Sequence, residues 1–213
     1  ASSYQKMIAE NGPFKTTFST FETRFVKDTK AHSIYDYLGT IYDDRMNYHY
    51  RGTRLGSELQ EDIRLGALGT LTLGTRYEEE KSDTGQPSIK RQDTNSLFAL
   101  YQITPIDRLN LSFGSRLDHV SVFGSFMTYR ATASYAVTST TRVHSSYGTG
   151  AKSPSLYQLY DQYYGNLALK PERSIGYDLG VEQTFLNGDA RLDATWFHNK
   201  IDQLIDWLST GPY

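Results

Sequence analysis

The chain has 213 residues, a formal net charge of −2, no cysteine and a mean hydropathy of −0.54. No run approaches the roughly 18 apolar residues that a membrane-spanning helix needs, so a helical membrane protein is excluded. The lack of cysteine excludes disulfide scaffolds and thiolate metal sites, and the nearly balanced charge gives no reason to expect a nucleic-acid partner. The 17 tyrosines and 10 phenylalanines suit either a transmembrane β-barrel or a secreted β-sandwich.

The N-terminal third is the least orderly part of the sequence. Residues 14–26 and 51–65 are predicted strands. Between them, residues 32–50 are polar and aromatic, and we interpret them as an extracellular excursion whose internal pairing the sequence does not assign. The chain starts at Ala1 without a signal-peptide pattern, so any such peptide is expected to have been removed or never included.

From residue 67 onward, apolar and polar side chains alternate as they do in barrel strands. In residues 107–120, Leu111, Phe113 and Leu117 share one parity, and mostly polar residues fill the other. The alternation recurs in residues 67–79, 97–103, 127–137, 175–182 and 191–196. Such strands have one apolar and one solvated face. Because an arginine facing lipid near the midplane costs about 2–4 kcal/mol, the following arginines are predicted to face the lumen: Arg108, Arg116, Arg130 and Arg142.

The connections between these segments are of two kinds. Long connections are expected at residues 81–91 and 151–173, and tight turns at Gly66 and residues 104–107, 138–141 and 187–188. Short turns on one side and long extracellular loops on the other are typical of outer-membrane barrels. A soluble sandwich would alternate too, but its turns would recur about every 8–12 residues without this asymmetry.

Counting the segments gives about nine antiparallel strands. Nine strands alone would leave two edge strands with unpaired backbone N–H and C=O groups in lipid, which a bilayer does not tolerate. The sequence therefore predicts an all-β fold, an antiparallel transmembrane β-barrel that is partial and belongs to a larger barrel.

The most informative segment is the long tyrosine-rich loop after residue 151. Tyrosines offer large amphipathic surfaces that lose little entropy on contact, so this loop is a candidate ligand site. The alternative interpretation is a turn that needs Pro154, Gly165 and Pro171 for its path and whose tyrosines form a membrane-interface girdle. The candidate substrate contacts are Tyr157, Tyr160, Asp161, Tyr163, Tyr164 and Asn166.

Several ordered motifs resemble those of TonB-dependent outer-membrane transporters. Residues 148–160 read GTGAKSPSLYQLY, residues 165–172 read GNLALKPE, and a Y-x-x-G-x-E strand follows. Upstream, residues 123–130 and the pair Arg116 and Asp118 are similar to the family's F-G-S-x-x-T-Y-R and R-x-D motifs. Ala151 and Leu167 depart from the usual aromatic and proline, which puts the local loop shape in doubt. The motif residues are Lys152, Pro154, Gly165, Asn166, Leu169, Pro171, Glu172, Tyr177, Gly180 and Glu182.

The resemblance implies a 22-stranded barrel in the outer membrane of a Gram-negative cell, plugged by an N-terminal globular domain. Residues 1–213 would form one middle section of its wall, without the plug domain and without the C-terminal strands, and would not transport alone. The implied partners are outer-membrane lipid, the plug domain, the TonB energy-coupling protein through the missing N-terminal part, and a small-molecule nutrient. The implied function is energy-coupled uptake of a scarce, bulky nutrient.

The absence of a histidine from the loop narrows the choice of nutrient. Haem importers of the family carry a histidine here, and no histidine lies between Lys152 and Leu169. The Y-Q-L-Y sequence most resembles that of cobalamin receptors and related siderophore receptors. The resemblance therefore favours a corrinoid (cobalamin) as the nutrient, with a ferric siderophore as the second choice. A passive porin-like or adhesion barrel and a soluble β-sandwich binding module are the other hypotheses.

No catalytic or cofactor motif is found in the sequence. It has no nucleophile elbow, phosphate loop or dinucleotide fingerprint, so we expect no enzyme and no cofactor. A metal site is not expected either, because the histidines have no close pair at ligand spacing: His32, His49, His119, His144 and His198.

Overall fold

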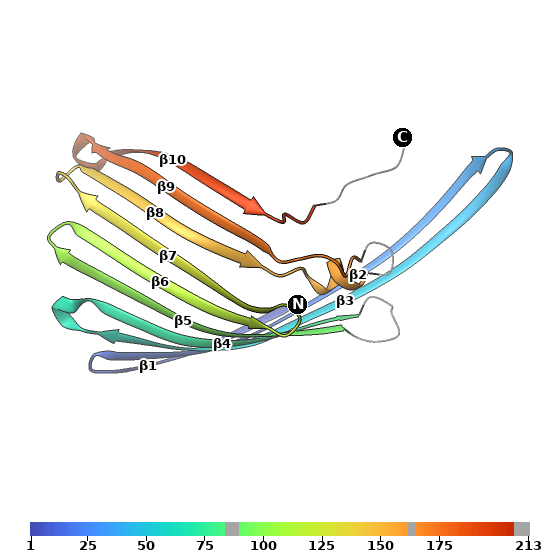
Figure 1. Cartoon of the computed structure of the whole chain (residues 1–213), viewed down its shortest axis with the longest axis horizontal. Coiled ribbons are helices and arrows are strands. Elements are labelled where there is room, and N and C mark those ends of the chain that lie inside the picture. Colours follow the sequence, from blue (N-terminus) through green and yellow to red (C-terminus); the bar gives the residue numbers. More distant parts are fainter. Residues whose placement is uncertain (84–89, 162–164, 207–213) are drawn as a thin grey trace.

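The computed structural model describes residues 1–83, 90–161 and 165–206 (Figure 1). Within these ranges, ten strands form one antiparallel sheet in chain order. The strands are β1 (Ser2–Asn11), β2 (Phe14–Tyr37), β3 (Thr40–Arg64), β4 (Thr70–Asp83), β5 (Lys90–Ile106), β6 (Leu109–Val120), β7 (Gly124–Ala136), β8 (Thr141–Lys152), β9 (Glu172–Phe185) and β10 (Ala190–Asp202). The helices are η1 (Gly66–Leu68), α1 (Leu156–Tyr160) and η2 (Leu186–Gly188).

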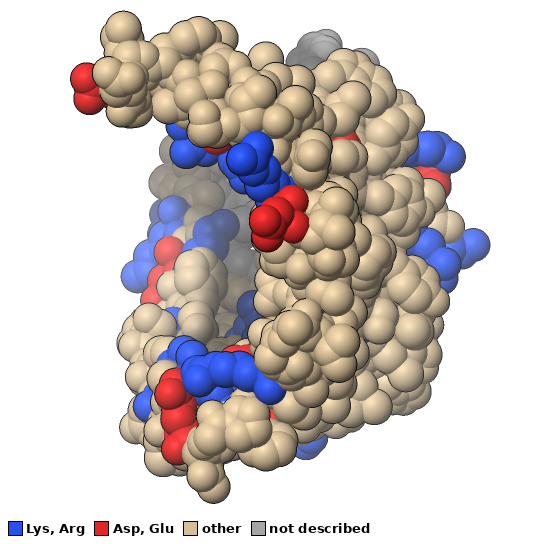
Figure 2. Space-filling model, turned by 90° about the vertical axis from the view of Figure 1, so that its left-hand side faces the viewer, with Lys and Arg blue, Asp and Glu red and all other residues tan. Residues whose placement is uncertain are grey.

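The sheet curves around a hollow without closing. In the described residues, β1 pairs only with β2 and β10 only with β9, so the sheet has two open edges. Figure 2 looks at the hollow from one end and shows charged side chains along much of it, while the outer side is largely uncharged. The predicted all-β, antiparallel and unclosed fold is thus confirmed.

The two ends of the sheet differ in their connections. The turns after β1, β3, β5, β7 and β9 lie together at one end, on the left of Figure 1, and we call this the short-turn end. The loop between β8 and β9 with α1 lies at the opposite end, which we call the loop end. Two connections at the loop end are nevertheless short, residues 38–39 between β2 and β3 and residues 121–123 between β6 and β7.

The N-terminal third differs most from the prediction. Residues 32–50, interpreted as an excursion with unassigned pairing, form the outer part of a long hairpin, in which β2 and β3 pair from Phe14 opposite Ile63 to Tyr37 opposite Thr40. Its tip is a two-residue turn with φ of 55° at Leu38 and 80° at Gly39, the left-handed backbone that tight hairpins use. The hairpin projects beyond the rest of the sheet (Figure 1).

β1 explains why ten strands are described and about nine were expected. Its sequence, SSYQKMIAEN, lacks regular alternation, and every residue in it is exposed. It forms a strand because it pairs in register with β2 along its whole length. Tertiary pairing therefore overrides a weak local signal.

The predicted assignment of side chains to two faces is confirmed by the register. Leu71 lies opposite Tyr101, which lies opposite Phe113, and this row continues through Ala131 to Tyr147 and Tyr177. All these residues have the apolar parity, and they define the outer face. The polar parity faces the hollow and includes Arg116, Arg130 and Arg142. Arg108 is a correction, because it lies in the turn between β5 and β6 with φ of 68° and not in a strand.

The sheet has almost no hydrophobic core of its own. Among the described residues, the buried hydrophobic side chains are Val120, Phe126, Leu156 and Leu159, all near the loop end. On the outer face, Phe113 is 52% exposed and Trp196 is 61% exposed. A β-sandwich would bury one face of each sheet against a second sheet, so the described single sheet does not fit that alternative. None of the helices in the described ranges is long and apolar enough to cross a membrane.

Candidate functional site: the loop between β8 and β9 and the pocket beneath it

The loop between β8 and β9 is closed at its base. Lys152 and Glu172 lie opposite each other in the register, and the Lys152 Nζ is 3.2 Å from the Glu172 Oε2. The other carboxylate oxygen of Glu172 accepts a hydrogen bond of 2.8 Å from the backbone N–H of Ile205. We call this arrangement the clasp. It holds both ends of the loop and the chain after β10 at one point.

The clasp lies beyond the outer apolar band, at the loop end of its strands. There the Ile205 N–H and then the Lys152 ammonium stabilise the charged carboxylate and hold the pKa of Glu172 below its usual range, against the opposing effect of burial. The side chain of Glu172 is thus stabilised in its ionised form, which the ion pair with Lys152 at the base of the loop requires.

Helix α1 is short and is fixed by its first residues. Ser155 is the N-cap, and its Oγ accepts a hydrogen bond of 3.2 Å from the backbone N–H of Gln158. The Gln158 Oε1 in turn accepts one of 2.9 Å from the Ser155 backbone N–H, which completes a capping box. The S-L-Y-Q sequence carries this signal in its serine and glutamine at the first and fourth positions.

Two leucines anchor α1 to the sheet. Leu156 is fully buried and Leu159 is 3% exposed. The helix contacts β4 and β5, and the backbone N–H of Leu156 donates to the carboxylate of Glu80 in β4. Pro154, just before the helix, is also among the most buried side chains. The loop therefore folds inward over the top of the hollow.

The second half of the loop needs its glycine. The Gly165 N–H donates to the Asp161 carbonyl at 2.9 Å, and the Asn166 N–H donates to the Gln158 carbonyl at 2.8 Å. A Cβ atom at Gly165 would lie 2.4 Å from the Asp161 carbonyl oxygen, a distance that real side chains do not reach. The Asn166 side-chain oxygen accepts from the Ala168 N–H at 2.9 Å and fixes the next turn.

The candidate substrate contacts lie in different surroundings. Tyr157 meets Tyr50 of β3 edge to face, with ring centroids 5.4 Å apart, and the Lys90 ammonium lies 5.1 Å from the centre of the Tyr160 ring. Asp161 is 5% exposed and ends α1, so its side chain has little surface for a ligand. Asn166 is exposed. Tyr163 and Tyr164 lie outside the described residues.

The strand part of the motif serves the wall of the sheet. Tyr177 faces outward, 42% exposed, and packs on Trp196 at 5.8 Å and His198 at 5.1 Å between ring centroids. This position fits the girdle interpretation for that tyrosine. The remaining motif residues support the backbone or pair charges: Leu169 and Pro171 are half-buried at the loop end, Gly180 lies against the His144 ring, and Glu182 forms ion pairs with Arg142 and Arg191.

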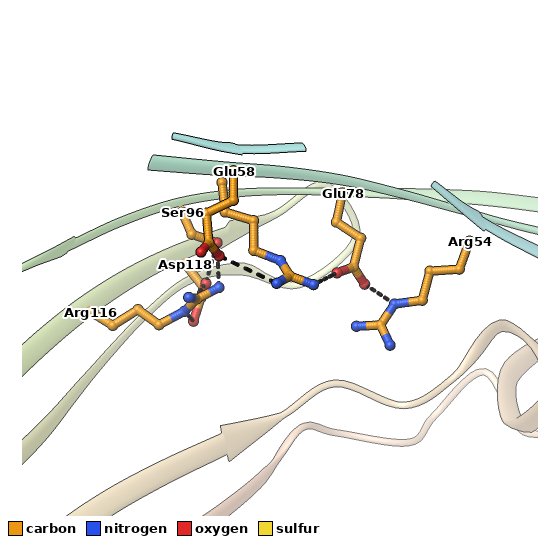
Figure 3. A network of polar contacts seen from close by, with 7 residues as sticks. Arg54, Glu58, Glu78, Ser96, Arg116 and Asp118 are labelled. Atoms are coloured by element: carbon orange, nitrogen blue, oxygen red, sulfur yellow. Dashed lines mark hydrogen bonds and ion pairs between the residues drawn. The ribbon is translucent and has the colours of Figure 1, made fainter. Parts of the chain in front are cut away.

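A polar network lines the hollow below the loop (Figure 3). Arg76 reaches Glu78 at 2.8 Å and Glu58 at 3.4 Å, and Glu78 also pairs with Arg54. Arg116 contacts Asp118 and the hydroxyl of Ser96, each at 2.8 Å. We call these side chains the inner network: Arg54, Glu58, Arg76, Glu78, Ser96, Arg116 and Asp118.

Sequence reasoning placed Arg116 on the lumen side but did not identify the inner network. The available signal was the repeated Arg-x-Glu and Arg-x-Asp spacing in β4 and β6. Residues two apart in a strand share a face, and opposite charges on neighbouring strands can pair. Which strands are neighbours, and in which register, is the information that the spacing lacks.

A pocket of about 690 Å³ lies between the inner network and the start of the loop. Its charged lining consists of both arginines and carboxylates, and Phe25, Val120 and Phe126 form apolar parts of its wall. The charged side chains are Arg54, Arg76, Glu78, Glu80, Arg116 and Asp118. Lys152, Pro154 and Ser155 of the loop line it as well. A pocket lined by charged side chains of both signs and by aromatic rings can bind an organic molecule with both polar and apolar surfaces.

Comparisons with known proteins agree with this architecture. Residues 3–213 match the family model described as TonB dependent receptor-like, beta-barrel. The vitamin B12 transporter BtuB of Photobacterium profundum is 30% identical over 131 residues, which cover 62% of this chain and 21% of that protein. BtuB of Vibrio cholerae is 35% identical over 95 residues, which cover 45% of this chain and 15% of that protein. The chain thus spans about a fifth of the length of the curated relatives it matches.

Solved structures show the same fold. A mutant of the ferric enterobactin receptor PfeA from Pseudomonas aeruginosa superposes with a TM-score of 0.79 at 20% identity, over 94% of this chain and 34% of that one. The siderophore receptor PirA from Acinetobacter baumannii gives a TM-score of 0.74 at 17% identity, over the same shares. At such identities the likeness concerns the fold alone. All these named relatives are transporters or receptors.

Proposed function

The chain belongs to the TonB-dependent receptor β-barrel family, and we propose that it forms part of the wall of an outer-membrane transporter that imports a scarce, bulky nutrient. The observation that carries this proposal is one continuous sheet with an apolar outer face, a charged inner face and a loop folded over the hollow. A hydrocarbon environment favours the first face and water the second. A wall that separates lipid from a polar lumen has this division.

The location and the partners are parts of the same proposal. Residues 1–213 would lie in the outer membrane of a Gram-negative cell, with the short-turn end toward the periplasm and the loop end outside. Other parts of the complete protein would supply the remaining wall, the plug domain and the contact with TonB. The polar inner face supports this, because a domain inside the hollow would meet charged and hydrogen-bonding side chains.

For the nutrient we propose a corrinoid, with a ferric siderophore as the alternative. The BtuB relatives, at 28–35% identity, favour cobalamin, and their alignments cover at most about two thirds of this chain. The siderophore receptors PfeA and PirA share the fold, which is the reason for retaining a ferric siderophore as the alternative nutrient. The ligand would meet Tyr157, Tyr160 and Asn166 of the loop before it reaches the pocket.

The test is a ligand titration with the full-length parent protein. The parent would be reconstituted in detergent or nanodiscs and titrated with cyanocobalamin and with a panel of ferric siderophores. We expect saturable cyanocobalamin binding, weakened when Tyr157 and Tyr160 are both replaced by alanine. Tyr177→Ala is the matched control, since this tyrosine faces outward. Siderophore binding without cyanocobalamin binding would refute the corrinoid, and binding of neither would refute the proposed function.

A further inference from the structure

Two buried side-chain oxygens on the inner face have no hydrogen-bond partner among the residues that the structure describes. They are the Ser82 Oγ at the loop end of β4 and the Gln92 Oε1 at the loop end of β5, and these residues are 1% and 7% exposed. Nearly all buried polar atoms in native proteins have a partner, because an unpaired one costs its full desolvation penalty. Both atoms therefore indicate that a further hydrogen-bond donor belongs at this end of the hollow.

Gln92 lies in the wall of the pocket beneath the loop. It lines the pocket together with Glu80, which lies directly opposite it in the register. Glu80 accepts the hydrogen bond from the Leu156 N–H, so the two side chains lie under the first turn of α1. The terminal torsion of a glutamine side chain is broad. The Gln92 amide can therefore turn its oxygen toward the pocket without a change in the backbone.

The cations that line this pocket already have carboxylate partners. The pairs are Arg54 with Glu78, Arg76 with Glu58 and Glu78, Arg116 with Asp118, and Lys152 with Glu172. An anionic ligand would have to compete with a carboxylate for each of these cations. The hydrogen-bonding capacity that remains unused at Gln92 is electrically neutral, and its natural complement is a neutral donor.

We propose that Gln92 binds a primary amide of the nutrient and so selects an amide-bearing ligand over an anionic ferric chelate. A primary amide carries two N–H donors and a carbonyl acceptor, the same set as the glutamine side chain. In this contact the Gln92 Oε1 accepts from the amide N–H, and the Gln92 Nε2 donates to the amide carbonyl. Corrinoids carry several primary amides around their macrocycle, and Phe25 and Phe126 offer apolar surface beside Gln92 for the macrocycle itself.

This role of Gln92 rests on the proposed function, in which the nutrient is a corrinoid. A site that hydrogen-bonds one group of a ligand rejects the analogue that lacks this group, because the polar atoms of the site are then left unpaired. One neutral hydrogen bond corresponds to about a two- to tenfold change in affinity. The contact thus predicts a specificity for one amide among those of the corrinoid.

The test uses the full-length parent protein and a series of corrinoids. The series contains cyanocobalamin and its monocarboxylate derivatives, in each of which one peripheral amide is replaced by a carboxylate. Gln92→Leu removes the side-chain amide, and Gln92→Glu keeps the shape of the side chain but adds a negative charge. The matched control is Gln102→Leu, an exposed glutamine on the same face of β5 at the short-turn end. Dissociation constants would be measured by titration calorimetry, and heat-modifiable gel mobility would establish that each variant folds.

We expect one monocarboxylate to bind the wild type and the control at least about twofold more weakly than cyanocobalamin does. Gln92→Leu should weaken cyanocobalamin binding by about two- to tenfold and abolish this difference. Gln92→Glu should enlarge the difference, because the two carboxylates repel each other.

Equal weakening of every corrinoid by Gln92→Leu would overturn the inference, since a purely structural role of Gln92 has that effect. An unchanged difference in Gln92→Glu would overturn it as well. If the wild type binds cyanocobalamin and Gln92→Leu binds it equally well, solvent satisfies the Gln92 oxygen, and the inference fails while the proposed function stands. A wild type that binds no corrinoid overturns the corrinoid proposal itself, together with this role of Gln92.

Discussion

Replacing Leu156 by alanine should release the loop between β8 and β9 while leaving the sheet intact. Leu156 is fully buried at the start of α1, where the helix contacts β4 and β5. Leucine-to-alanine replacement at such sites costs about 2–5 kcal/mol, through lost transfer energy and the cavity left behind. Because every 1.4 kcal/mol is tenfold, the opening equilibrium of the loop should rise by a factor of about 30 or more.

Hydrogen exchange measures this opening directly. In the full-length parent, the backbone amides of Leu159, Asp161 and Gly165 donate inside the loop and should exchange faster in the variant, up to the limit of a fully open loop. Leu167→Ala is the matched control, because Leu167 lies in the same loop and is 71% exposed, so its effect should stay within about 0.5 kcal/mol. Equal exchange rates in both variants would refute the conclusion that Leu156 anchors the loop.

The remaining predictions concern the loop backbone, the two faces and the clasp. Gly165→Ala should cost about 1–3 kcal/mol of loop stability, because its Cβ would overlap the backbone, and unchanged exchange of the loop amides would contradict this. Phe113→Arg on the outer face should lower the unfolding free energy of the parent in lipid vesicles by about 2–4 kcal/mol, whereas Ser112→Arg on the inner face should cost little. Similar losses in the two variants would refute the assignment of Phe113 to the lipid side and Ser112 to the hollow. Since the folded state lowers the pKa of Glu172 below the ordinary glutamate value of 4.5, the clasp is complete above that pH, and its contribution is lost as the pH falls through the lower folded value. Protease cleavage of the loop should therefore rise on acidification, and Lys152→Met should weaken this pH response; a pH-independent cleavage rate would contradict the role of the clasp.

The fold could be predicted wherever one face of a strand is uniformly apolar. Residues 107–120 illustrate this, because Leu111, Phe113 and Leu117 alternate with polar residues and β6 occupies almost the same range. β1 and the outer half of the β2–β3 hairpin lack such a face. These segments are strands because they pair with a neighbouring strand. The 24 residues of β2 pair along their whole length, but such pairing does not require alternating apolar residues in a polar sequence.

The candidate site was predictable in its local parts and not in its contacts across strands. Ser155 and Gln158 form a capping box that their spacing alone encodes, and the glycine at position 165 marks a sharp turn. The contact between Tyr157 and Tyr50 joins residues that are far apart in the sequence, as do the ion pairs of the inner network. Such contacts depend on strand order and register, which the composition of one segment does not contain.

The distribution of burial also constrains what must surround this sheet. In the described part of the chain, the few buried hydrophobic side chains lie in α1 and at the loop end of the sheet, while large outer-face residues such as Leu97, Leu192 and Trp196 remain more than half exposed. Covering each such side chain would stabilise the fold by about 1.5–3 kcal/mol. The inner face requires the opposite environment. Removing the ion pairs of Arg76 and Arg116 from water would cost more free energy than the attraction between their charges provides, unless new polar partners replaced the solvent. The outer surface therefore requires an apolar environment and the hollow requires water or a polar partner, so the sheet is stable only where two such environments meet.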